Sequence, residues 1–183
     1  MAQATRINAT EYFELPSYKE NNLIQLIAGE VIVGMPPIPK HQAIVREILV
    51  LLTLLARKLG GTAFDSPIEV YLDEDNVYQP DVLYLKPDSA CEVGDKRLIG
   101  APDLVVEVLS PSTAKHDRHH KYQAYEKHGI SEYWIIDPVH ETIEVWVNSE
   151  ANTFELLGAF DKADTFTSPI LNEKIEVAPL FVM

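Results

Sequence analysis

The chain has 183 residues, 46% of them apolar, so we expect a single domain over 1–183 with one packed core. Lys and Arg number 15 against 28 Asp and Glu, and the net charge of −13 argues against a protein that coats nucleic acid through positive surface. The single cysteine, Cys91, excludes an internal disulfide and suits a reducing cytoplasm. No signal-peptide pattern or bilayer-length apolar stretch is present, so we expect a cytoplasmic location and no membrane association.

The first third of the chain predicts helices and one or two short strands. Residues 8–18 predict a short capped helix, and 23–33 predict one or two strands. Prolines at 36, 37 and 39 predict a rigid loop without helix. The clearest helix covers 41–59, because apolar residues recur there at helical spacing: Ile44, Ile48, Leu51, Leu52, Leu55 and Leu59.

The rest of the chain reads mainly as strands. We expect strands at 63–72, 81–85 and 103–109, the last apolar on both faces except at Glu107, as in a strand covered on both sides. The segment Ser110-Pro111-Ser112-Thr113 predicts the start of a helix that runs to about His128. Further strands follow, at 132–136, 142–147 and 154–160. This order predicts the α/β class, with a mixed α+β sheet and helices packed on it.

Two acidic residues stand where buried strands would normally be apolar. Asp81 follows Pro80 and opens a strand, whereas Glu107 lies in the middle of one. Burying an unpaired carboxylate is costly, so each is expected to have a partner, a proton or a metal. If the two strands are neighbours, both side chains can reach one hard ion such as Mg²⁺. The alternative is that Asp81 caps a turn and Glu107 pairs with a buried Arg or Lys; Asp103, about 13 Å from Glu107 along its strand, is expected to take no part.

The remaining candidates are basic or ambiguous. Lys121 could orient a water molecule and stabilise charge on a phosphate, or it could form a solvent-facing pair with Asp117 four residues earlier. The run 115–121 could receive a phosphate backbone or be the wet face of a helix. His41 could be a site residue or merely part of a first helical turn. For Glu30, beside an apolar strand, it is likewise undecided whether it is a site residue.

Several segments together resemble the Uma-two family of endonucleases: Gly29-Glu30, Pro39-Lys40-His41, Gln79-Pro80-Asp81-Val82, 101–113, 121–125 and 129–138. The resemblance covers nearly the whole chain, from about Thr10 to Phe181. The family is placed in the PD-(D/E)XK superfamily. Membership implies a restriction-endonuclease-like core, in which helices flank a central mixed β-sheet and the site lies at one end of that sheet.

The resemblance also assigns roles to residues. Asp81 matches the Asp of the motif and Glu107 its second acid, so both are expected to bind the metal. The motif lysine should stand two residues after that acid, where this chain has Leu109, but Lys121 matches the lysine that related families place on the next helix. Glu30 and His41 match recurrent positions and are carried as further catalytic candidates.

The function implied is a Mg²⁺- or Mn²⁺-dependent endonuclease that hydrolyses phosphodiester bonds in DNA. Leu109 and the net charge of −13 favour a rival, a catalytically silent nuclease-fold module that binds a partner or nucleic acid. A metal phosphodiesterase that acts on a substrate other than DNA is a third reading. The apolar C-terminal strands further suggest a homodimer, because two-fold dimers are the commonest assemblies.

Overall fold

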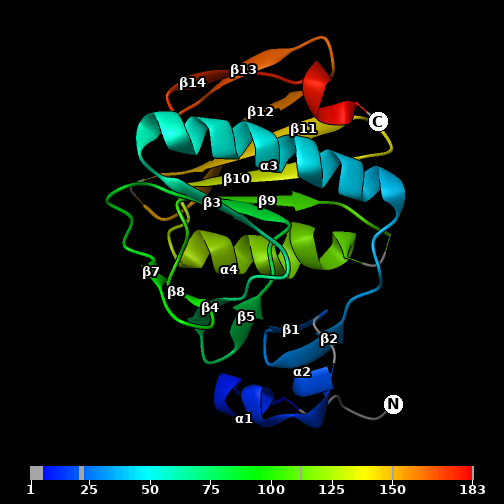
Figure 1. The fold of residues 1–183 in the computed structure, drawn as a ribbon, viewed down its shortest axis with the longest axis vertical. Coiled ribbons are helices and arrows are strands. Elements are labelled where there is room, and N and C mark those ends of the chain that lie inside the picture. The colour runs from blue at the N-terminus through cyan, green and yellow to red at the C-terminus, as the bar shows by residue number, and fades with distance from the viewer. Residues whose placement is uncertain (1–5, 21–22, 112, 150, 183) are drawn as a thin grey trace.

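A six-stranded mixed sheet forms the centre of the molecule in the computed structural model, which describes residues 6–20, 23–111, 113–149 and 151–182. The strands lie in the order β12-β11-β10-β9-β6-β3 (Figure 1). Only β9 and β10 run parallel to each other. Their bounds are β3 (Thr62–Asp65), β6 (Val82–Leu85), β9 (Leu104–Val108), β10 (Glu132–Asp137), β11 (Thr142–Asn148) and β12 (Phe154–Phe160).

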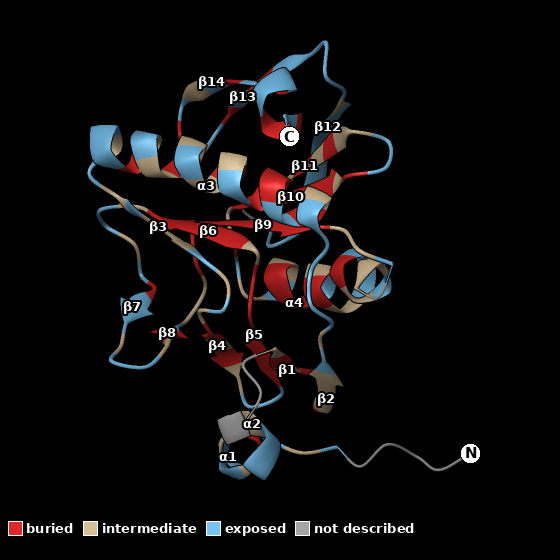
Figure 2. Ribbon diagram, turned by 45° about the vertical axis from the view of Figure 1, so that its right-hand side comes forward, coloured by how far each residue is buried: buried red, intermediate tan, exposed pale blue. Residues whose placement is uncertain are grey.

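Helices cover both faces of this sheet, which confirms the predicted mixed architecture. The long helix α3 (Pro39–Leu59) packs on one face, against alternate strand residues such as Val82 and Val106. On the other face lies a π-helix, η1 (His116–Lys121), which continues into α4 (Tyr122–Lys127). Figure 2 shows the consequence: the strands between the two layers are almost entirely buried, and α3 is buried only on its inner side.

The three predicted helices each differ in part from expectation. Helix α3 begins at Pro39, inside the predicted proline loop, because proline is tolerated at the first helical position where its missing N–H is not needed. It ends as expected at Gly60, which adopts a left-handed φ of 82°. The helix expected from Ser110 is π-helical over its first half, and Ser112 of its predicted start lies outside the described residues. The predicted helix at 8–18 is two short helices, α1 (Ala9–Glu14) and α2 (Pro16–Glu20).

A second, smaller sheet packs against the far side of α4. Its strand order is β2-β1-β5-β4-β8-β7, so α4 lies between two sheets and buries Tyr125 completely. The strand predicted over 63–72 is in fact two strands in different sheets, β3 and β4, separated at Pro67, which cannot continue a central strand. The bounds are β1 (Ile24–Ile27), β2 (Glu30–Val33), β4 (Val70–Asp73), β5 (Asn76–Tyr78), β7 (Glu92–Val93) and β8 (Leu98–Ile99).

The C-terminal segment packs beside α3 on the same face of the central sheet. The hairpin β13 (Thr165–Ser168) and β14 (Glu173–Glu176) and the 3₁₀ helix η2 (Ala178–Phe181) lie above α3 in Figure 1. Their apolar side chains join the same core cluster as the inner face of α3. In the part of the chain that is described, no helix is long and apolar enough to cross a membrane.

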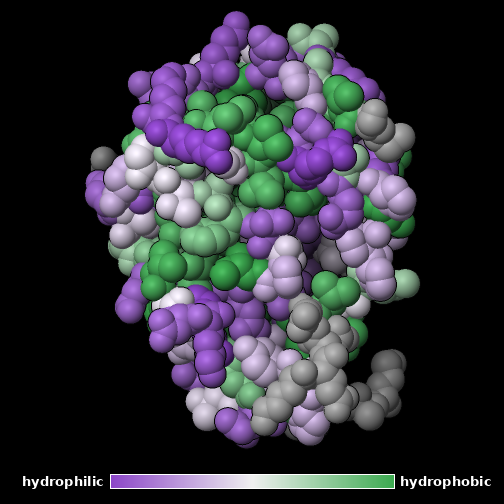
Figure 3. All heavy atoms as spheres, viewed as in Figure 1, coloured by the Kyte–Doolittle hydropathy of each residue, from purple (hydrophilic) through white to green (hydrophobic). Residues whose placement is uncertain are grey.

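Pairs of exposed apolar side chains lie on α3 and on β12, among others. Val50 and Leu54 project from α3, and Figure 3 shows hydrophobic side chains gathered in the middle of the face that α3 crosses. On the edge strand β12, Leu156 and Leu157 are about half exposed. The homodimer expected through the C-terminal strands stays a prediction, which the mass in solution tests.

Candidate active site

Asp81 and Glu107 come from adjacent antiparallel strands. Strands β6 and β9 pair with Val82 opposite Val106, so the next position in the same register sets Asp81 opposite Glu107. Directly opposed residues of an antiparallel pair project to the same face, which here is the α4 face. The expectation that the two strands are neighbours is therefore met, and the two carboxylates share one end of the central sheet.

Asp81 does not cap a turn, because it is tied to the neighbouring strand. Its Oδ2 accepts a hydrogen bond of 2.7 Å from the backbone N–H of Val108 and lies 3.4 Å from Nε2 of His41. His41 Nε2 is also 2.9 Å from the carbonyl oxygen of Val108. Since a carbonyl can only accept, Nε2 carries the proton. The first turn of α3 is thus attached to Asp81 and to β9 at one point.

Glu107 lies deeper and has two donors. It is only 3% exposed, and its Oε1 accepts hydrogen bonds of 2.8 Å from Lys121 Nζ and 2.7 Å from the Tyr125 hydroxyl. Lys121 Nζ also lies 3.2 Å from Oδ1 of Asp117. Lys121 does pair with Asp117, but the expectation that this pair faces solvent is wrong, because both residues are buried. The lysine bridges Asp117 to Glu107.

The site carries more acid than base. Burial raises the pKa of Glu107 to about 8; the charge of Lys121 opposes this rise, and the charges of Asp117 and Asp81 add to it. Burial alone would lower the pKa of Lys121, but Glu107 and Asp117 raise it above its ordinary value. The lysine therefore keeps its proton, and one buried ammonium has to serve several carboxylates.

The pKa of His41 is also raised. Burial works to lower the pKa of His41, but the hydrogen bond and charge of Asp81 raise it above its ordinary value. Its other ring nitrogen, Nδ1, is buried and has no hydrogen-bond partner among the described residues. Asp81 therefore favours the protonated form of His41 more than burial alone would allow.

The residues present fit a hard divalent cation. The donors are carboxylate oxygens, and both oxygens of buried Asp117 lack a hydrogen bond within the described ranges, so negative charge at the site is incompletely satisfied. Those ranges contain no group of three or more His, Cys, Asp or Glu residues arranged to hold a metal. Mg²⁺ is commonly held by one or two carboxylates together with water and substrate phosphate. Asp81 and Glu107 would be those two ligands.

Glu30 is placed differently from the other predicted residues. It lies half-buried on β2, at the turn of the β1–β2 hairpin, and its charge acts on His120 of η1. No described hydrogen bond or ion pair joins it to Asp81 or Glu107. The structure therefore brings together Asp81, Glu107, Lys121 and His41, and leaves Glu30 beside η1.

Two neighbours of Lys121 were missed as site residues. Tyr125 donates to Glu107, and Asp117 contacts the lysine ammonium. Both are four residues from Lys121 along the chain, so helical spacing alone could have placed all three on one buried stripe. The π-helical turns could not be read from sequence; such segments are rare and frequently occur at functional sites.

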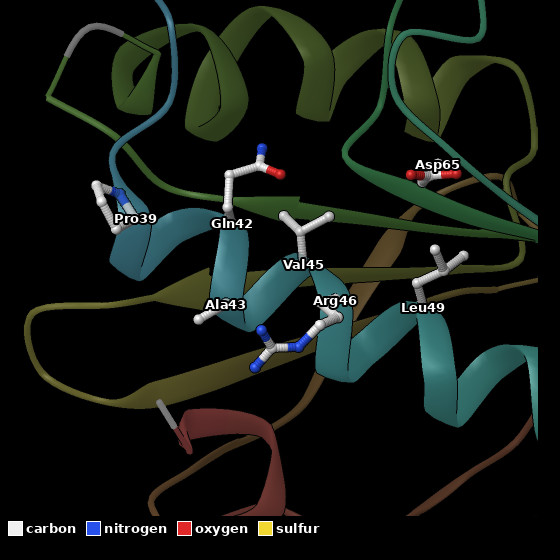
Figure 4. Close-up of a pocket in the computed structure, with 7 residues that line it drawn as sticks. All are labelled: Pro39, Gln42, Ala43, Val45, Arg46, Leu49 and Asp65. Carbon is white, nitrogen blue, oxygen red and sulfur yellow. The ribbon is translucent and has the colours of Figure 1, made fainter.

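A shallow hollow of about 500 Å³ lies beside the first half of α3 (Figure 4). Asp65, which lines it, pairs with Val82 next to Asp81, so the hollow borders the site without including its acids. In Figure 4, Gln42 and Val45 project from α3 toward the strands, and Arg46 points the other way. The lining residues are Pro39, Gln42, Ala43, Val45, Arg46, Leu49 and Asp65.

Comparisons with known proteins agree with this geometry. The model of the Uma2 family, described as "Putative restriction endonuclease", matches residues 9–179. Among solved structures, one described as a putative nuclease belonging to DUF820 from Anabaena variabilis ATCC 29413 superposes with a TM-score of 0.77. It is 22% identical, and the match covers 96% of this chain and 97% of that one, which establishes a shared fold. No curated protein matched the sequence.

Proposed function

Because the chain belongs to the Uma2 family, we propose that it is a metal-dependent endonuclease that hydrolyses phosphodiester bonds in DNA, with Asp81 and Glu107 as metal ligands. The observation that carries the proposal is the pairing of two carboxylates across β6 and β9, with a buried lysine in contact with one of them. Mg²⁺ or Mn²⁺ bound there would polarise a phosphate and lower the pKa of a bound water.

Lys121 takes the place of the motif lysine. Position 109 holds Leu, but the ammonium of Lys121 on η1 lies 2.8 Å from Oε1 of Glu107 on β9. A buried, fully charged ammonium at that point can attract a phosphate oxygen and stabilise the charge that develops on it. This geometry supports an active site over the silent module, because the departure at Leu109 removes no positive charge from the site.

The other residues orient these groups. Tyr125 donates to Glu107 and holds the carboxylate in one position, while His41 does the same for Asp81 through the end of β9. Such preorganisation matters because a displacement of about 1 Å in reacting groups can reduce a rate roughly a hundredfold. Glu30 remains a candidate helper base only if substrate or metal draws β2 toward the carboxylates.

Cleavage of plasmid and single-stranded DNA with Mg²⁺ or Mn²⁺ tests the proposal. Wild type should cut, and Asp81→Asn and Glu107→Gln should reduce cutting by at least about a hundredfold. Asp103→Asn is the matched control, because Asp103 is a buried acid of the same segment whose oxygens bind Lys86 rather than the site. Equal loss in all three variants would point to misfolding, and intact cutting in the first two would refute the assignment.

The two rival functions give different results. A silent binding module would bind nucleic acid or a partner yet cut neither DNA nor a small phosphodiester with either metal. A phosphodiesterase with another substrate would hydrolyse bis(4-nitrophenyl) phosphate but leave DNA intact. A cytoplasmic location and a homodimer remain predictions, checked by cell fractionation and by light scattering.

A further inference from the structure

We propose that the outer face of η1, formed by Lys115, His116, His119 and His120, binds the phosphate backbone of the nucleic acid that enters the site. We call these four residues the η1 basic face. The inference rests on the proposed function and names the surface that would hold its substrate. It concerns residues outside the acid–lysine cluster.

The π-helix divides its residues between two sides. Asp117 and Lys121 point inward and are buried, and the Tyr133 hydroxyl donates to the backbone carbonyl of Asp117, which fixes the inner side on β10. Lys115 and His119 are exposed, and His116 and His120 are partly exposed. One short helix therefore presents Lys121 to the carboxylates and the η1 basic face to solvent.

No carboxylate in the described ranges lies within ion-pair distance of any residue of the η1 basic face. Single cations such as Arg57, Lys96 and Lys174 also have no ion-pair partner there, but these four basic residues lie together on one short segment. Arg118, on the same helix, is bound by Glu144 at 2.8 Å. In a chain with a net charge of −13, four adjacent basic side chains without acidic partners indicate that their counter-charge comes from a ligand.

The histidines make this face sensitive to protonation. Nδ1 of His116 and Nδ1 of His120 lie 3.2 Å apart, so the two nitrogens can share one proton. A second proton on this pair is disfavoured, because both rings would then be positively charged. Burial lowers the pKa of His120, the neighbouring His116, His119 and Lys115 lower it further, and Glu30 on β2 is the facing acid that opposes them. A bound phosphate would favour the second proton, so affinity for a polyanion should rise as the pH falls from about 8 to about 6.

The position of the face relative to the site favours a polymer over a mononucleotide. Lys121 follows His120 directly, and η1 starts close after the end of β9 that carries Glu107. A phosphate held at the carboxylates therefore has its neighbours along the strand within reach of η1. Contacts of this kind position a backbone without reading sequence.

The test compares Lys115→Gln/His119→Gln with Arg118→Gln as the matched control. Binding of a fluorescent DNA duplex is followed by anisotropy in Ca²⁺ at pH 6.5 and pH 8, and at several salt concentrations. We expect the double variant to lose about tenfold in affinity at pH 6.5, less at pH 8, and to reduce the salt slope by about one to two. Arg118→Gln should stay within about twofold of wild type, because its charge is already engaged by Glu144.

Hydrolysis of bis(4-nitrophenyl) phosphate separates this inference from the proposed function. It should be unchanged in the double variant, since the small substrate does not reach the η1 basic face. A wild type that cuts DNA, with a double variant that binds as tightly as wild type, would overturn the inference and leave the function standing. Equal weakening by Arg118→Gln would also overturn it. A wild type that binds DNA through this face but cuts neither substrate would defeat the function alone.

Discussion

Lys121→Met is the change that reveals most about the acid cluster. Methionine keeps roughly the shape of the side chain and removes its charge, which leaves Glu107 and Asp117 buried without the ammonium that now lies 2.8 Å and 3.2 Å from them. Removing one partner of a buried ion pair typically costs about 3–5 kcal/mol. We therefore expect the free energy of unfolding to fall by about 4 kcal/mol at pH 9, above the raised pKa of Glu107, which is a large part of the 5–15 kcal/mol typical of a domain.

Urea denaturation measures this loss. With a slope of about 2 kcal/mol per molar, a loss of about 4 kcal/mol moves the midpoint down by about 2 M. The double variant Lys121→Met/Glu107→Gln should recover part of it, because the stranded carboxylate is then neutral. The loss should also shrink as the pH falls through about 8, the raised pKa of Glu107, because its carboxyl then takes up a proton.

Two results would refute this reasoning. A midpoint shift below about 0.5 M would show that the ammonium is not engaged as the distances imply. Additive effects of Lys121→Met and Glu107→Gln in the double variant would show that the two charges do not interact. A divalent ion offers a further check: 10 mM Mg²⁺ should stabilise Lys121→Met more than wild type, because it restores positive charge to the cluster.

Three more outcomes follow from the structure. Glu132→Ala should lower the free energy of unfolding, measured in urea, by about 2–4 kcal/mol. This buried carboxylate accepts hydrogen bonds from an indole, a hydroxyl and a backbone N–H, and alanine would leave these donors unsatisfied. Glu132→Gln should lower the free energy of unfolding by less. Metal affinity measured by calorimetry should rise with pH up to about 8, and protons should be released on binding. The reason is that a metal ligand must be deprotonated, and burial raises the pKa of Glu107. A pH-independent affinity would exclude Glu107 as a ligand. Burial would raise the pKa of Asp73, but hydrogen bonds, including that of His128, lower it below its ordinary value. Asp73 therefore stabilises the fold above its ordinary pKa, and this contribution is lost as the pH falls through the lowered value. Asp73→Asn should be less stable than wild type at pH 7 by up to about 1 kcal/mol and indistinguishable from it near pH 2.

Most of the central sheet and α3 could be predicted from the sequence, because their patterns are local. An apolar stripe at helical spacing marks α3, and apolar runs mark β9 and β10. Of the second sheet, the sequence predicted strands at β1, β2 and β4 but not the sheet itself, since β5, β7 and β8 are only two or three residues long and gain their order from packing against α4 and each other. Strands of that length leave no periodicity to detect.

The candidate site divides in the same way. Asp81 and Glu107 stand out because an acid in an apolar strand is costly wherever it occurs. The burial of Lys121 could not be seen, because a lysine four residues after Asp117 has the same spacing on an exposed helix as on one enclosed between two sheets. Which side of η1 faces inward depends on its π-helical turns and on β10, and both are properties of the folded molecule.

The packing of the C-terminal segment beside α3 has a consequence for the order of assembly during synthesis. Helix α3, which brings His41 to Asp81, shares its core cluster with the central sheet and with Phe166, Ile175 and Leu180. A nascent chain emerges from the ribosome with every acid and the lysine of the site before those last three side chains appear. Until they do, part of the core cluster that α3 shares with them is open to water, and the helix is held more weakly. We therefore expect the contact between His41 and Asp81 to become stable only after this segment has been made.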